Sequence, residues 1–398
     1  MGPPPLFPDE RLSVKAAYRR ELATLALLFL RLGATAFGGP AVHIALMERE
    51  VVTRRRWQTR EEFLDLLGAT NLIPGPNSTE MAMHIGHRRA GFAGLVVAGA
   101  AFILPAAVIV GVLGWVYVRF GALPRVTALL AGIKPAMIAV VAIALFGLAR
   151  SAVRSVGLGV LAAQSVAAVA VGVNELLVLL GAGVVALAAR ARGGGGVGTL
   201  AFAGPLSLTA VAPGACAIAA APFSLFTLFG AFLKMGSILF GSGYVLLAYL
   251  RADFVQRLGW LTEGQLLDAV TVGQVTPGPV STTATFIGFL KGGAAGAAVA
   301  TVGIFLPAFV FVALSSALIP RLRRSKLAGG FLDGVNVASL ALMAVVTAQL
   351  GRAALTSAWT IAVAVISLLV LLRHPRASVW LVVFGALAGL GADWLGGS

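Results

Sequence analysis

The residues best suited to chemistry stand in two short Pro-Gly-Pro segments. One is Pro74-Gly75-Pro76 with Asn77, Ser78 and Thr79 behind it, and the other is Pro277-Gly278-Pro279 with Val280, Ser281, Thr282 and Thr283 behind it. Proline ends the helix before it, glycine permits a tight turn, and Asn, Ser and Thr are good helix N-caps. Each segment therefore predicts a broken helix whose new N-terminus offers backbone N–H groups to an anion. An ordinary kink is the alternative, but the repetition of the whole motif favours a functional site.

Positive charge for such a site is available at Arg31 and Lys234, which lie inside apolar segments. Charges within membrane helices are costly and usually functional, although both side chains could instead reach toward an interface. Further candidates for the substrate site are the amides of Asn71 and Gln274 and the glycines Gly38, Gly39, Gly241 and Gly243. These glycines would interrupt the opening helices opposite the Pro-Gly-Pro breaks, or would serve only close helix packing.

Few acidic residues could carry a coupling proton. Glu80 follows the first Asn-Ser-Thr run, while Asp65 and Asp268 are the other candidates. An acid beside an anion site could hold the proton that a coupled carrier moves, although a carboxylate at a helix N-terminus is also favoured by the helix dipole alone. His84 and His87 have no third ligand in the sequence pattern, so no metal site and no cofactor are predicted.

Composition excludes a soluble domain. The chain has 398 residues, 59% of them hydrophobic and only 11% charged, against roughly 25% charged in soluble domains. Its single cysteine, Cys216, excludes an internal disulfide framework. No phosphate loop or nucleophile motif is present, which argues against an enzyme and against ATP-driven transport. The sequence predicts an all-α polytopic membrane protein.

Self-comparison shows that the chain contains two copies of one unit. Phe29-Leu30-Arg31-Leu32-Gly33 reappears 203 positions later as Phe232-Leu233-Lys234-Met235-Gly236, and both Pro-Gly-Pro segments keep this offset. Such a match cannot hold over so long a stretch by chance. We assign residues 1–21 to a cytoplasmic amphipathic arm, 22–190 to the first copy, 191–223 to a linker and 224–395 to the second copy.

Basic residues fall on different loops in the two copies. The first copy is basic after its opening helix, between Arg49 and Arg60, whereas the second is basic between Arg321 and Lys326 and again at Arg373. Because basic loops stay in the cytoplasm, the two copies are predicted to be antiparallel, with about five to six membrane segments each and roughly 10 to 13 in all. The N-terminus would then be cytoplasmic and the C-terminus periplasmic.

Several motifs resemble those of the chromate ion transporter family. They are Phe37-Gly38-Gly39-Pro40, Arg54-Arg55-Arg56-Trp57, Pro74-Gly75-Pro76-Asn77, Phe240-Gly241-Ser242-Gly243-Tyr244 and Val275-Thr276-Pro277-Gly278-Pro279. The resemblance covers nearly the whole chain in the two-copy form. It implies an ion-gradient-driven carrier of the bacterial inner membrane that exports chromate, with sulfate as the similar dianion. The second copy departs from the first in having Val280 in place of Asn77.

The predicted function is therefore export of a tetrahedral oxyanion by alternating access. The expected partners are the anion and the lipid bilayer, with no nucleic acid, and a homodimer is left open. Two alternatives remain at this point: an anion channel, and a carrier for another small anion. The backbone N–H groups and the hydroxyls behind each Pro-Gly-Pro would hold the anion, and Arg31 and Lys234 would supply charge.

Overall fold

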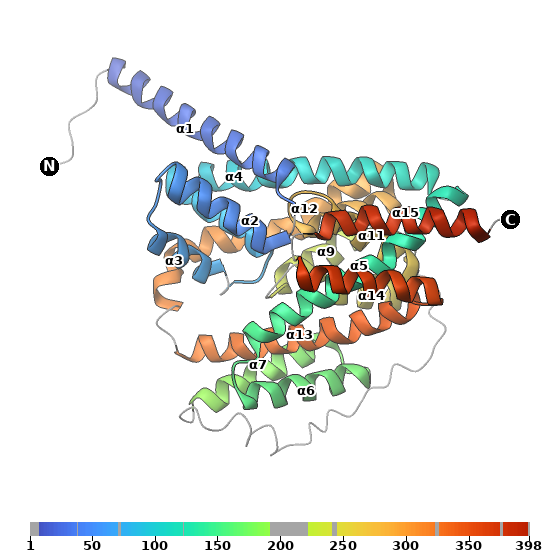
Figure 1. Cartoon of the computed structure of the whole chain (residues 1–398). Coiled ribbons are helices and arrows are strands. Elements are labelled where there is room, and N and C mark those ends of the chain that lie inside the picture. The colour runs from blue at the N-terminus through green and yellow to red at the C-terminus, as the bar shows by residue number, and fades with distance from the viewer. Residues whose placement is uncertain are drawn as a thin grey trace.

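The computed structural model describes residues 8–37, 39–70, 73–121, 123–191, 222–240, 245–322, 326–374 and 377–396. Every regular element in these ranges is a helix (Figure 1). The predicted all-α class is thus confirmed for the described part of the chain. Most of the linker lies outside these ranges.

The helices of the two halves correspond one to one over most of their length. The first half contains α1 (Pro8–Thr35), α2 (Gly39–Glu48), the π-helix η1 (Arg49–Arg54), α3 (Arg60–Thr70), α4 (Asn77–Phe120), α5 (Pro124–Ala152), α6 (Val156–Ala170) and α7 (Glu175–Ala191). The second half contains α9 (Leu225–Ile238), α10 (Leu246–Leu250), the π-helix η2 (Arg251–Arg257), α11 (Glu263–Val275), the short 3₁₀ helix η3 (Val280–Thr282), α12 (Thr283–Leu322), α13 (Lys326–Ala354), α14 (Ala358–Arg373) and α15 (Ser378–Gly396).

The N-terminal arm and the first apolar helix form one continuous helix. Helix α1 runs without a break from Pro8 to Thr35, past residue 21, where the predicted amphipathic arm ends. The physical reason is local: the segment between these residues is rich in Ala, Leu, Arg and Glu, and its glycine, Gly33, comes only near the end. The arm is therefore the outer part of the opening helix, and it projects from the rest of the molecule in Figure 1.

Each Pro-Gly-Pro segment separates two helices. In the first half, α3 ends at Thr70 and α4 begins at Asn77. Arg88, in the first part of α4, pairs with Glu62 at the start of α3, their nearest atoms 2.8 Å apart. The first part of α4 therefore returns toward the side of the molecule where α3 begins.

A second sharp turn follows inside α4. Ala90 and Gly91 leave the helical conformation, and the chain reverses so that a Cβ at Gly86 would overlap the carbonyl oxygen of Gly94. In α12 the equivalent turn is at Gly292 and Gly293, with the same contact between Gly288 and Gly296. Glycine at these contacts lets the two parts of each helix pack backbone to backbone. The longer part of each helix then crosses the molecule.

The two copies are interlocked along their length. Helix α4 packs against α12, α5 of the first copy packs against α14 and α15, and α13 of the second copy packs against α6 and α7. Gly132 of α5 touches the backbone of Gly389, and Gly334 of α13 approaches Ala182 in the same way. The core of the protein is thus largely an interface between the copies.

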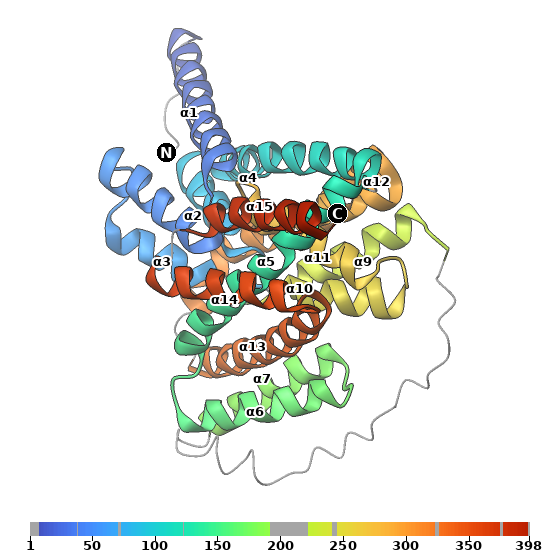
Figure 2. The same cartoon turned by 45° about the vertical axis from the view of Figure 1, so that its right-hand side comes forward.

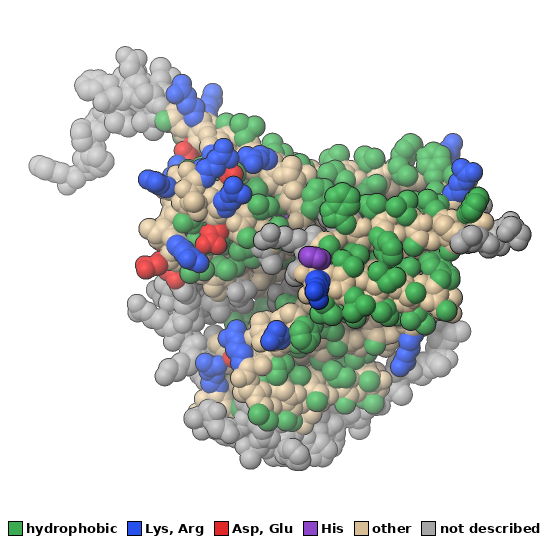
Figure 3. Space-filling model, viewed as in Figure 1, with side chains coloured by type: hydrophobic (Ala, Val, Ile, Leu, Met, Phe, Trp, Pro, Cys, Tyr) green, Lys and Arg blue, Asp and Glu red, His purple; other side chains and the backbone are tan. Residues whose placement is uncertain are grey.

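Four of the described helical segments are long and apolar enough to cross a membrane. They are Asn77–Phe120, Arg125–Ala152, Val280–Ser315 and Gly329–Ala354, and shorter apolar helices accompany them. Large apolar side chains such as Trp115, Val108, Trp380 and Leu387 are exposed on α4 and α15. Figure 3 shows this apolar surface, with a group of Lys and Arg side chains over α1 to α3 and others scattered over the rest of this face. Such a surface is that of a multi-pass membrane protein.

Candidate functional site

The two Pro-Gly-Pro loops cross between the copies and meet the ends of the opening helices. The backbone N–H of Gly75 donates to the carbonyl of Leu239, just beyond α9, over 2.6 Å. Reciprocally, the N–H of Gly278 donates to the carbonyl of Ala36, just beyond α1, over 3.0 Å. Both donors and both acceptors are 203 positions apart in the chain, so the contact repeats the internal symmetry. Four broken helix ends therefore meet at one interface.

Glycine is required at the turn of both loops. Gly75 has a φ of 146° and Gly278 a φ of 88°. Residues other than glycine rarely adopt these values. A Cβ on Gly278 would come within 2.6 Å of the Cβ of Ala106 and within 2.9 Å of the carbonyl oxygen of Gly33. The loops thus have no space for a side chain at the point where the copies touch.

The hydroxyl residues behind each loop are buried: Ser78, Thr79, Ser281, Thr282 and Thr283. Thr282 and Thr283 donate to the carbonyls of Pro279 and Val280, each over 2.8 Å. Thr79 Oγ1 and Ser281 Oγ have no hydrogen-bond partner within the described part of the chain. Buried hydroxyls normally find a partner, so these two are available to a polar ligand.

Glu80 lies directly behind the first loop and is fully buried. Neither of its carboxylate oxygens has a hydrogen-bond partner among the described residues, and Oε1 lies where a Cβ on Gly75 would be. Its counterpart in the second copy is Thr283. The site is therefore asymmetric: one half carries an acid against the crossing loop, and the other half carries a hydroxyl.

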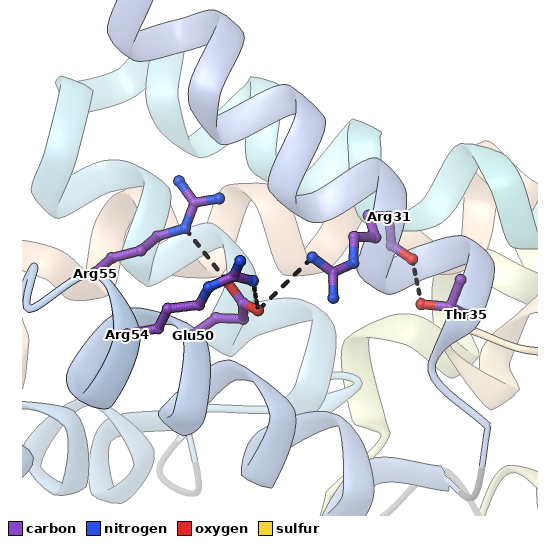
Figure 4. A network of polar contacts seen from close by, with 5 residues as sticks. All are labelled: Arg31, Thr35, Glu50, Arg54 and Arg55. Atoms are coloured by element: carbon purple, nitrogen blue, oxygen red, sulfur yellow. Dashed lines mark hydrogen bonds and ion pairs between the residues drawn. The ribbon is translucent and has the colours of Figure 1, made fainter.

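A cavity of about 420 Å³ lies beside the opening helix of the first copy. It is lined by Arg31, Leu32, Thr35, Leu46, Arg49, Glu50 and Arg54. The carboxylate of Glu50 is clamped by Arg54 at 3.0 Å, Arg55 at 3.4 Å and Arg31 at 3.8 Å (Figure 4). Burial alone would raise the pKa of Glu50, but hydrogen bonds from Arg54 and Arg55 and the charges of Arg54 and Arg31 lower it overall. Glu50 is therefore a permanent negative charge at neutral pH.

The second copy has the equivalent cavity, of about 880 Å³. Lys234, Ile238, Tyr249, Ala252, Asp253 and Arg257 line it at the positions that Arg31, Thr35, Leu46, Arg49, Glu50 and Arg54 occupy in the first copy. Asp253 pairs with Lys234, and it also accepts from Arg257 over 2.8 Å. Arg251, another lining residue, is paired with Glu263.

Asp268, one of the predicted coupling residues, belongs to a different network. It is buried in α11, and it pairs with Lys134 of α5 at 3.0 Å and accepts from Tyr117 of α4 at 2.9 Å. Both partners come from the first copy, so this network also joins the halves. Asp65, at the equivalent position of the first copy, is exposed on α3. The two aspartates therefore share a position in the repeat but not an environment.

The structure brings only some of the predicted site residues together. Pro74, Pro76, Pro277 and Pro279 flank the crossing glycines, Gly39 begins α2, and Asn77 begins α4. Gln274 lines a small cavity with Thr283. Arg31 and Lys234 line separate cavities whose lining residues include none from the loops. Gly38, Asn71, Gly241 and Gly243 lie outside the described residues.

Sequence reasoning missed Glu50 and Asp253 as partners of the two predicted cations. The signal was present, because Glu50 and Asp253 keep the same offset as Arg31 and Lys234, and so do Arg54 and Arg257. Both acids also lie in π-helical turns, η1 and η2, which often occur at functional sites.

Two interlocked copies of a helical unit, with broken helices meeting at their interface, define a multi-pass membrane transporter. The family model described as "Chromate transporter" matches residues 23–187 and again residues 226–390. The chain belongs to this chromate transporter family, and hence to the transporters and not to the enzymes. Both ends of the match shift by the same 203 residues, from 23 to 226 and from 187 to 390.

Three chromate transport proteins are similar to this chain over most of its length. The chain is 31% identical to a "Probable chromate transport protein" of Synechococcus elongatus, covering 96% of this chain and 98% of that one. It is 31% identical to the "Chromate transport protein" of Cupriavidus metallidurans, covering 95% of each. The "Chromate transport protein" of Pseudomonas aeruginosa is 32% identical over 81% of this chain and 80% of its own length. No solved structure matches the chain.

Proposed function

We propose that the protein is a secondary active transporter that exports chromate from the bacterial cytoplasm by alternating access. The observation that carries the proposal is the reciprocal contact of Gly75 with Leu239 and of Gly278 with Ala36. A site built from both copies at their interface changes its access when one copy rocks against the other. Chromate is proposed as the substrate because the relatives are named as chromate transport proteins.

The substrate site is the region of the four helix ends. Chromate and sulfate are tetrahedral dianions, and helix N-termini bind such ions through backbone N–H groups. The N-terminal turns of α4 and η3 supply these groups, and the buried hydroxyls of Thr79 and Ser281 add donors that have no partner among the described residues. Arg31 and Lys234 act from the cavities on either side by drawing the anion in.

The two copies are proposed to be antiparallel in the inner membrane. In Figure 2, α2 and α3 lie at one end of the molecule, while α9 and α10 lie at the other. Helix α1, which begins the described chain, and the C-terminal end of α15 also lie toward opposite ends in Figure 1. With the basic loops in the cytoplasm, the N-terminus is cytoplasmic and the C-terminus periplasmic. The Pro-Gly-Pro hairpins then enter the membrane from opposite sides as re-entrant segments.

The unequal charge of the two cavities supports export as the proposed direction of transport. The first cavity, on the cytoplasmic side in this orientation, is lined by three basic side chains and one acidic one. The second is lined by three basic side chains and two acidic ones, Glu175 and Asp253. A dianion is therefore attracted more strongly at the cytoplasmic entrance than at the periplasmic exit.

Glu80 is the proposed carrier of the coupling proton. Its oxygens have no hydrogen-bond partner in the described part of the chain. Because an ionised carboxylate in such a place is costly to bury, the acid is expected to hold a proton while Gly75 stays in contact with Leu239. Opening of the loops toward water would release that proton. Asp268 already has Lys134 and Tyr117 as partners, which makes it the weaker candidate.

Transport into proteoliposomes tests the substrate. Purified protein is reconstituted, and uptake of labelled chromate is measured with an excess of unlabelled chromate, sulfate, molybdate or phosphate. Chromate itself should compete best and sulfate next. A carrier for another small anion would show a stronger competitor than chromate, which would overturn the substrate assignment.

The two cations are tested in cells. Arg31→Ala and Lys234→Ala should each abolish chromate resistance while the protein still reaches the membrane. Arg150→Ala is the matched control, because Arg150 is an exposed residue of α5 that lines neither cavity. Full chromate resistance in both Arg31→Ala and Lys234→Ala would show that these cations are not needed for export.

A further inference from the structure

In the function proposed above, the carboxylates of Glu50 and Asp253 contribute only to the net charge of their cavities, yet both copies place an acid directly among the cations of the cavity. Glu50 bonds two arginines and lies near a third, and Asp253 pairs with Lys234 and Arg257. Their side chains are only 10% and 5% exposed, whereas those of Arg31, Arg54 and Arg257 are more than half exposed. The acids are therefore fixed, and the cations extend into the open space.

The cavities themselves are much larger than the carboxylates that they hold. Volumes of about 420 and 880 Å³ leave room for an oxyanion with several waters, since one water occupies about 30 Å³ in the liquid. Guanidinium groups bind carboxylates and tetrahedral oxyanions through the same parallel N–H donors. The donors that hold Glu50 are thus the donors that a sulfate-like dianion would use.

We infer that each cavity is an anion-binding vestibule whose resident carboxylate, Glu50 or Asp253, competes with a divalent tetrahedral oxyanion for the same cations. When the oxyanion enters the first vestibule, Arg31 and Arg54 turn from Glu50 to the ligand. Arg55 still bonds Glu50, and the negative charge of this carboxylate repels the bound anion, which keeps the affinity for the anion low enough for passage onward. Asp253 acts in the same way on Lys234 and Arg257. The inference rests on the proposed function for the identity of the ligand, but its test needs no transport.

Binding of sulfate to the purified protein in detergent tests the inference. Sulfate is used because it does not oxidise the protein, and its apparent Kd is taken from isothermal calorimetry and from thermal shifts. Glu50→Gln removes the competing charge with little change in volume, so sulfate should bind about 3- to 10-fold more tightly. Asp253→Asn should act in the same direction. Arg54→Gln should weaken binding.

Two matched controls separate competition from general charge effects. Glu48→Gln removes a carboxylate two positions away that pairs with Arg60 and does not line the cavity. Asp333→Asn removes one that pairs with Arg190 and lies outside the second cavity. Both should leave the sulfate Kd unchanged.

Three results would overturn the inference. Unchanged or weaker sulfate binding in Glu50→Gln and Asp253→Asn would show that the acids only stabilise the fold. Failure of both variants to fold would lead to the same conclusion. If the unmutated protein bound neither sulfate nor chromate, the cavities would not be anion-binding vestibules. Tight binding in a protein that does not transport chromate would instead contradict the proposed function and leave this inference intact.

Discussion

At the residue scale, the glycines of the crossing loops determine whether the two copies can touch. Gly278→Ala should destabilise the protein, because the new Cβ would press on Ala106 in a backbone conformation that only glycine adopts easily. The expected cost is about 1–3 kcal/mol, seen as a lower Tm in detergent. In Gly147→Ala the new Cβ meets no atom within 4 Å, so this control should be neutral or slightly stabilising. Equal Tm values for both variants would contradict the packing described for the loops.

Glu80 is the residue on which proton coupling depends. Glu80→Gln keeps the size of the side chain but removes the proton that can be released. Chromate transport in this variant should no longer respond to an imposed pH gradient, while exchange of chromate for chromate continues. Glu61→Gln, on the exposed surface of α3, should respond as the unmutated protein does. An undiminished response in Glu80→Gln would exclude this carboxylate as the carrier.

Residues constrained by their immediate neighbours were predictable from the sequence. The breaks at Pro74 and Pro277 follow from covalent chemistry that acts over a few residues. The partner of Arg31 was not predicted, because Glu50 lies beyond α2 in the sequence and comes near Arg31 only in the folded chain. The environments of Asp65 and Asp268 could not be separated either, since the difference between them arises from Lys134 and Tyr117.

At the element scale, the hairpin of α3 and α4 should hold its two outer ends close together. In a Cys216→Ser background, Glu62→Cys combined with Arg88→Cys should be joined by a short bifunctional maleimide, because the native side chains form an ion pair. Glu62→Cys combined with Arg119→Cys is the control, since Arg119 lies at the far end of α4. Gel mobility after cleavage between the two positions reports the link. Efficient joining of the control pair, or none of the first pair, would contradict the hairpin.

Broken helices were predictable at this scale, but the reversals inside α4 and α12 were not. Gly91 and Gly293 adopt positive φ within long apolar runs that contain other glycines as well. Which glycine turns the chain depends on the later contact between Gly86 and Gly94 and between Gly288 and Gly296. That contact is tertiary, and no local pattern specifies it.

At the scale of the whole molecule, the two vestibules should open to opposite sides of the membrane. Thr35 and Ile238 line them at equivalent positions. In the Cys216→Ser background, Thr35→Cys should react with a membrane-impermeant maleimide from the cytoplasmic side and Ile238→Cys from the periplasmic side. Right-side-out vesicles expose the periplasmic side to the reagent, and inside-out vesicles expose the cytoplasmic side. Reaction of both positions from one side would contradict the antiparallel arrangement.

The repeat and the chromate transporter family could be predicted from the sequence, because both depend on motifs and on their spacing along the chain. The interlocking of the copies could not. That α5 packs on α14 and α15, and α13 on α6 and α7, depends on side chains that meet across the full length of the chain. The positions of Asn71 and Gly38, outside the described residues, remain predictions.

The central claim is that the interface between the copies carries an anion by alternating access, and counterflow tests this claim most directly. Proteoliposomes are loaded with unlabelled chromate and diluted into a trace of labelled chromate, with the membrane potential clamped at zero. A carrier exchanges one anion for another, so internal chromate should drive a transient accumulation of label well above equilibrium. Label that only equilibrates, at a rate independent of internal chromate, would identify an anion channel and contradict the account.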